Sequence, residues 1–192
     1  MYKAAARLFP GITACAKRGP PIFSAGRLGY GPNRNILKRA HRAKAISIVS
    51  ANTVAVGALA ADPSPTPSTQ FCHAGEVYIY TSAGAIWNQQ AILRAGNLGE
   101  SDRFGSALGL DGNLLVVGAP GENSPSGGID GNGSLSGPAD SGAACVFRRQ
   151  GTTWSQWSYL KAAIPRQGAW FGNANAVSIS GGHGCDRFSG GS

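Results

Sequence analysis

A repeat with a spacing of about 67 residues is the feature of this 192-residue sequence that most constrains its fold. The recurring pairs are Gly75 and Gly142, Trp87 and Trp154, Phe104 and Phe171, and Gly105 and Gly172. The apolar segments 54–58 and 115–119 form a further pair that lies slightly closer together, so the second copy carries a longer loop after this segment. A fixed period of this size indicates stacked copies of one supersecondary unit.

Each copy is predicted to form four short β-strands, and the second copy shows them most completely. Short runs of apolar, β-branched and aromatic residues place them at 104–110, 114–118, 143–148 and 153–160. The first two are separated by a turn in which Gly112 supplies a positive φ. A sheet of this size must bury its faces against neighbouring sheets, as the blades of a propeller do. We therefore expect an all-β fold of β-propeller blades, each with four antiparallel strands.

The motif order identifies a family resemblance. Phe104-Gly105 precedes Gly118-Ala119-Pro120, and Gly75 and Gly142 open the third strand of each copy. This order resembles the FG-GAP repeat of integrin α-chain propellers, in its shortened bacterial form, over residues 45–182. The resemblance implies a non-catalytic extracellular or cell-surface segment for adhesion or protein interaction. The chain supplies about two blades plus one strand, so we expect an incomplete ring that needs further blades in cis or in trans.

Calcium binding is a second property of many members of that family. Their calcium loop lies between the Phe-Gly and Gly-Ala-Pro elements, where this chain has only Asp111, so that site is not carried over. In the longer loop of the second copy, Asp130, Asn132, Ser134 and Asp140 imitate the alternating ligands of a calcium loop. The simpler interpretation is a Gly/Ser/Pro-rich surface loop, and we expect no cofactor.

Charge divides the chain into regions. Residues 1–44 contain ten Lys or Arg and no Asp or Glu, whereas the remainder has seven basic and nine acidic residues. We expect 1–44 to be a disordered, Pro/Gly-rich basic arm, 45–182 to hold the repeats, and 183–192 to be a disordered or truncated end. The arm leaves a transit peptide or nucleic-acid binding open, although binding of nucleic acid is not favoured. No secretory signal is legible, and no apolar run is long enough to span a bilayer.

Residues with catalytic or redox chemistry are few and scattered. The sequence lacks nucleophile-elbow, phosphate-loop and zinc-protease motifs, and its histidines are not placed beside a readable Ser and Asp. The four cysteines form no Cys-x-x-Cys pair: Cys15, Cys72, Cys145 and Cys185. We therefore predict that the protein is not an enzyme.

Two tryptophans stand outside the repeat pattern. Trp157 and Trp170 have no counterpart of the same type at the repeat spacing, and we expect them at the surface, where aromatic residues favour binding. Trp87 and Trp154 are instead expected in the blade core. An accessory domain of a secreted hydrolase and a non-functional fragment of a longer propeller protein stay open as alternatives.

Overall fold

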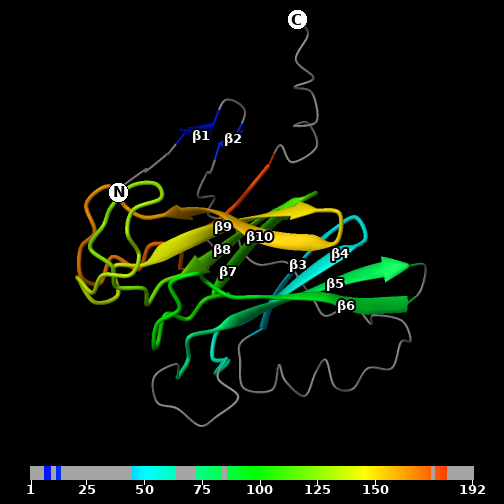
Figure 1. The fold of residues 1–192 in the computed structure, drawn as a ribbon, viewed down its shortest axis with the longest axis horizontal. Helices are drawn as coiled ribbons and strands as arrows, with labels where there is room; N and C mark the ends of the chain where they lie inside the picture. The colour runs from blue at the N-terminus through cyan, green and yellow to red at the C-terminus, as the bar shows by residue number, and fades with distance from the viewer. Residues whose placement is uncertain are drawn as a thin grey trace, which may run out of the picture.

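The computed structural model describes residues 7–9, 12–13, 45–63, 72–83, 86–173 and 176–180. These residues contain no helix, and their strands form two four-stranded sheets and one two-stranded sheet (Figure 1). In the two-stranded sheet, β1 (Arg7–Phe9) pairs with β2 (Ile12–Thr13). The rest of the predicted basic arm and the predicted end at 183–192 lie outside the described residues. The expectation of an all-β fold is confirmed.

The first sheet is an antiparallel meander of four consecutive strands. It consists of β3 (Ala45–Ser50), β4 (Thr53–Ala58), β5 (Glu76–Ala83) and β6 (Ile86–Leu93), hydrogen-bonded in that order. The short connections from β3 to β4 and from β5 to β6 require this arrangement, because only antiparallel neighbours can be joined so directly.

The second sheet repeats this topology with β7 (Ala107–Asp111), β8 (Leu114–Ala119), β9 (Ala143–Gln150) and β10 (Thr153–Leu160). One predicted boundary is wrong. Phe104 was expected to begin the first strand, but the strand starts only at Ala107, because Arg103 and Gly105 both adopt positive φ angles that interrupt an extended chain. The described residues form two blades and do not close a ring.

Local details of the backbone repeat with the sequence period. The turn between the first two strands places Ala51 in one sheet and Gly112 in the other at positive φ. Both sheets also carry a β-bulge at the same position, with Gln90 as the extra residue in β6 and Trp157 in β10. The two sheets are therefore copies of one unit, and Trp87 and Trp154 lie at equivalent places in them.

The main hydrophobic core lies between the two sheets, which pack face to face (Figure 1). Val77 and Ile79 from β5 and Leu115 and Val117 from β8 are fully buried in it. Phe104 is also fully buried, and its ring meets that of Phe147 edge-to-face with 5.9 Å between centroids. The facing sheets thus bury the apolar side chains that neither could bury alone.

A third unit begins on the outer face of the second sheet, which we define by Val116, Ala144, Val146 and Leu160. The half-buried side chains of Phe171, Val177 and Ile179 pack against this face. The described part of the third unit forms no strand of its own. The chain therefore continues the stack of blades in the same direction beyond the second sheet.

Candidate functional site

The Phe-Gly motif forms the junction between successive units. Phe104 donates its backbone N–H to the carbonyl of Ala74 at 2.9 Å, and Phe171 donates to the carbonyl of Ser141 at 3.2 Å. Beside each bond lies a glycine at positive φ, Gly75 in the first unit and Gly142 in the second. A Cβ at either glycine would overlap with the backbone of the following phenylalanine. The junction therefore needs glycine both for its backbone conformation and for the close approach.

A second glycine pair completes each junction at the end of the second strand. A Cβ at Gly57 would overlap with the carbonyl of Gly105, and a Cβ at Gly118 would overlap with the carbonyl of Gly172. Gly105 and Gly172 both have positive φ angles themselves. The repeat-motif residues expected from the sequence thus meet across unit boundaries, and each Phe-Gly docks on the preceding unit.

The loop between β8 and β9, residues 120–142, is closed at its neck by Lys161. The Lys161 ammonium donates to the Glu122 carboxylate at the start of the loop, and to Ser141 Oγ at 2.8 Å and the Gly142 carbonyl at 3.0 Å at its end. Gly142 N–H also donates to the Glu122 carbonyl at 2.8 Å. Contacts between distant parts of the sequence therefore hold both ends of the loop together.

The ion pair at this neck is buried on both sides, with the Lys161 side chain fully enclosed. The second carboxylate oxygen of Glu122 accepts 3.0 Å bonds from Asn97 Nδ2 and from the Ser124 backbone N–H. Among the described residues, no buried side-chain nitrogen or oxygen lacks a partner. A buried ion pair must have its remaining hydrogen-bonding capacity satisfied to offset desolvation, and this one is fully satisfied.

Burial also shifts the acidity of groups around the neck. Desolvation raises the pKa of Asp102 to about 7; its bond from Gly99 N–H and the charge of Lys161 oppose this rise, and the charge of Glu122 adds to it. Desolvation also raises the pKa of Tyr159, whose hydroxyl lies 2.7 Å from Ser124 Oγ, and that of Cys145 to about 12. The Cys145 thiol is therefore protonated and unreactive at neutral pH.

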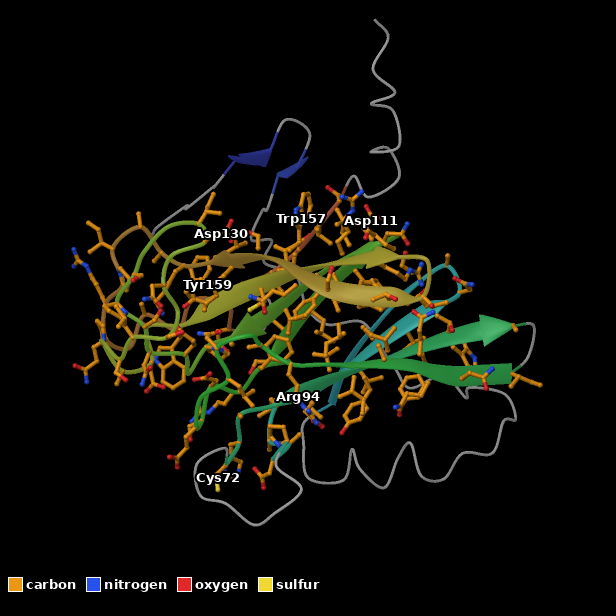
Figure 2. The ribbon with its side chains drawn as sticks, in the orientation of Figure 1. Cys72, Arg94, Asp111, Asp130, Trp157 and Tyr159 are labelled. Carbon is orange, nitrogen blue, oxygen red and sulfur yellow. The ribbon has the colours of Figure 1, made fainter. Side chains whose placement is uncertain are left out.

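The middle of the loop is fastened along the end of β10. Ile129 forms an antiparallel bridge with Leu160, and Lys161 N–H donates to the carbonyl of Gly128 at 2.8 Å. Asp130 accepts 2.8 Å bonds from Ser158 Oγ and from Tyr159 N–H (Figure 2). The loop thus has a fixed shape despite its Gly, Ser and Pro content.

The four residues named as calcium candidates all lie in this loop. The carboxylate of Asp130 is engaged with β10, the side-chain oxygen of Asn132 accepts a 3.0 Å bond from Ser134 N–H, and Asp140 accepts Trp170 N–H through its carbonyl. Within the described ranges, no group of three or more His, Cys, Asp or Glu side chains converges on one point. Their local bonds give each of them a role in the loop itself.

Residues that the sequence did not single out form the neck. Glu122 directly follows the Gly-Ala-Pro-Gly run, and Lys161 lies one repeat after Arg94, the other cation that directly follows a fourth strand. The repeated cation was a usable signal that both positions carry an ion pair, but it could not identify the carboxylate partner, since Arg94 pairs with Glu76 and Lys161 pairs with Glu122. Asp102 gave no signal, since the same position of the next unit is Ala169.

Both tryptophans outside the repeat lie beside arginines. Trp157 is 40% exposed and Arg148 lies over its ring at 5.5 Å, while Trp170 is half-buried with Arg103 at 5.2 Å. Surface exposure is therefore confirmed for Trp157 and only partial for Trp170. In the part of the chain that the structure describes, no helix is long and apolar enough to cross a membrane.

Comparison with protein families matches residues 87–147 to the FG-GAP repeat. The matched segment runs from β6 through the first Phe-Gly junction to β9 and includes the whole β8–β9 loop. Comparison with curated proteins gives no match.

Proposed function

Starting from the FG-GAP repeat that this chain carries, we propose that the protein is a non-catalytic β-propeller repeat module that binds a protein partner through the β8–β9 loop. The chain forms a β-propeller-like repeat domain, and binding surfaces on such scaffolds are carried by loops that a rigid framework positions. The resemblance to integrin α-chain repeats supports a cell-surface or extracellular setting. The module would act together with further blades.

The exposed apolar side chains on this fixed loop carry the proposal. Ile129 is 47% exposed and Leu135 is 51% exposed, yet the loop that bears them is tied down at its neck and along β10. Exposed apolar groups on a loop that is already ordered bind a partner without the entropic cost of fixing the loop. This combination favours a protein-binding role over a solvated linker.

A binding assay with matched variants tests the proposal. The full chain is immobilised, and retention of extracellular matrix proteins and of intact cells is measured with and without calcium. The double variant Ile129→Ser/Leu135→Ser is expected to reduce retention by about tenfold or more. The control Ile164→Ser removes a side chain that is 70% exposed outside the loop, and it should retain binding.

Two outcomes would overturn the proposal. One is a wild-type chain that is folded and retains neither matrix protein nor cells under any condition. The other is equal loss of binding in the loop variant and in the Ile164→Ser control, which would show that the loop is not the contact surface. Far-UV circular dichroism of each variant ensures that the fold is intact.

A further inference from the structure

Asn132 in the β8–β9 loop carries the chemistry of a spontaneous modification that the proposed function does not use. It is the one asparagine of the sequence that glycine follows, and it is exposed. Glycine has no Cβ that would stand between its backbone nitrogen and the preceding side chain. The amide carbon Cγ of Asn132 is therefore accessible to the backbone nitrogen of Gly133.

A hydrogen bond folds the Asn132 side chain back over the peptide that follows it. Its Oδ1 accepts the backbone N–H of Ser134 at 3.0 Å. Because this oxygen reaches the second backbone nitrogen along the chain, Cγ must pass close to the first, which is the nitrogen of Gly133. The electrophilic carbon and the nitrogen that can attack it are thus held together before any reaction.

The Ser134 N–H also lies where negative charge develops during such an attack. Attack on Cγ of Asn132 turns Oδ1 into an oxyanion, and a donor that already bonds this oxygen stabilises it. Asn97 Nδ2 donates to the Gly133 carbonyl at 3.1 Å, and this carbonyl belongs to the same peptide group as the Ser134 N–H. Hydrogen bonds in series polarise one another, so Asn97 makes Ser134 a stronger donor.

Two other residues of the loop with a small neighbour are restrained by their contacts. Asn123 is exposed, but the Ser124 N–H that would have to attack it donates to the buried Glu122 carboxylate at 3.0 Å. Asp130 is followed by Gly131, but its carboxylate accepts two hydrogen bonds from β10 and is held against that strand. The contacts that shape the loop thus leave the Asn-Gly pair as its reactive site.

We propose that Asn132 deamidates spontaneously in the folded protein, through attack by the backbone nitrogen of Gly133. This nitrogen loses its proton to hydroxide, forms a bond to Cγ and expels the amide nitrogen, which leaves as ammonia after taking a proton from water. The product is a cyclic succinimide, and water opens it at either carbonyl to give aspartate or isoaspartate. The net reaction consumes water and releases ammonia, and it needs neither an oxidant nor an enzyme.

The modification changes the loop that the proposed function uses. Either product adds a carboxylate to a loop that also presents the exposed side chain of Leu135. Isoaspartate also lengthens the backbone by a carbon, which shifts the Gly133 carbonyl relative to Asn97. A new charge close to an apolar contact must lose water when a partner binds, so conversion should weaken binding. This consequence rests on the proposed function, whereas the deamidation itself does not.

Peptide mapping of the aged full chain tests the proposal. Folded protein is incubated at mildly alkaline pH, and the products at Asn132 and Asn123 are separated and identified by mass over time. Asn132 is expected to convert to a mixture of isoaspartate and aspartate while Asn123 stays intact. Isoaspartate identifies the succinimide route, because direct hydrolysis of the side-chain amide gives aspartate alone.

Matched glycine variants test the geometry of the attack. Gly133→Ala places a methyl group beside the attacking nitrogen and should slow conversion of Asn132 by about tenfold or more. The control Gly131→Ala adds the same group on the other side of Asn132 and should leave the rate unchanged. Unfolding the wild-type chain in urea needs no variant: it frees the Ser124 N–H, so the ratio of conversion at Asn132 to that at Asn123 should fall by about threefold or more.

The results separate this inference from the proposed function. A folded chain whose Asn132 stays intact overturns the inference, and so does aspartate as the sole product or equal slowing in both glycine variants. Retention of matrix protein or cells is then compared between fresh and aged chains, with Asn132→Gln as a control whose longer side chain resists ring closure. Retention that falls only in the converted chain supports the consequence for binding. A chain that converts but retains nothing when fresh leaves the deamidation standing and removes the proposed function.

Discussion

Arg94 and Lys161 occupy the same position of the repeat, directly after the fourth strand of the first and second sheets. Arg94 is 49% exposed and pairs with Glu76 on the neighbouring strand β5. Lys161 is fully buried and pairs with Glu122 at the neck of the β8–β9 loop. The same positive charge therefore forms an ion pair at a strand end in one blade and holds a loop closed in the other.

The difference shows how a repeat can acquire a site without changing its framework. In the Arg94–Glu76 pair the carboxylate is buried, but the arginine is half-exposed, so water screens the pair and it contributes less to stability. A buried pair is indispensable once it forms, because losing one partner strands the other charge away from water. The two blades both carry a cation at this position. They differ in how deeply the cation is buried and in which carboxylate it pairs with.

Removing each cation in turn is expected to show the largest difference between the two blades. Lys161→Met leaves the Glu122 carboxylate buried and unpaired, so the free energy of unfolding should fall by about 3–5 kcal/mol. Arg94→Met should lower it less, by about 1 kcal/mol, because water reaches the half-exposed side of this pair and the Tyr78 hydroxyl still donates to the buried Glu76 carboxylate. Urea unfolding measures both, and equal losses would contradict the distinction. Adding Glu122→Gln to Lys161→Met should recover part of the loss.

The pH dependence of stability should distinguish the two junctions. Burial raises the pKa of Asp102 to about 7, above its value in the unfolded chain, so the folded state holds this proton more tightly. This stabilisation is complete below about pH 4 and is lost as the pH rises through about 7. Between pH 5 and 7 the loss should be about 2 kcal/mol.

Asp102→Asn should remove that dependence, since the amide oxygen can still accept the Gly99 N–H bond. The next unit has Ala169 at the equivalent position and contributes no such titration. Thermal unfolding across this pH range is the measurement. An unchanged pH profile in the Asn variant would assign the effect to another group.

Substituting the close-approach glycines should reveal how much structure each junction supports. Gly57→Ala forces a Cβ against the Gly105 carbonyl between the two complete sheets, and it should cost about 1–3 kcal/mol of global stability. Gly118→Ala makes the matching overlap with Gly172, at the junction with the described residues 171–180 of the third unit. Its effect should be confined to faster hydrogen exchange in residues 171–180. Equal global losses would contradict this view.

The smallest expected effect concerns two aspartates that hold loops. Asp130→Ala removes bonds to Ser158 and Tyr159 and should cost about 1 kcal/mol while speeding hydrogen exchange in residues 128–134. Asp62→Ala removes one exposed bond from His73 N–H and should cost less. A larger loss from the Asp62 variant would show that the β8–β9 loop is not the more firmly held of the two.

The period in the sequence predicted the strands of both sheets because the signals there are local. Gly112 marks its turn, and Leu114 to Val117 form the continuous apolar run of a strand buried on both faces. The start of β7 was misplaced because Phe104 is apolar enough for a strand, while the positive φ of Arg103 and Gly105 depends on docking to the previous unit. That contact is tertiary and has no local signature.

The candidate site was harder to predict for the same reason. Asp130 and Asp140 were named as calcium candidates beside the simpler interpretation of a surface loop; in the structure the Asp130 carboxylate accepts bonds from β10, and the Asp140 backbone carbonyl accepts Trp170 N–H. Lys161 lies 39 residues from Glu122 and 20 from Ser141 in sequence, so no spacing rule joins the three. Only the fold brings them to one neck.

The closed neck of the β8–β9 loop makes its interior an exchangeable cassette. Because Lys161 fixes both ends and Asp130 holds the middle of the loop on β10, the residues between Asp130 and Asp140 can change in length and composition with these contacts kept. A foreign recognition peptide grafted between Asp130 and Asp140 would start and end at fixed positions. The same blade could thus acquire new specificities by replacement of one insert.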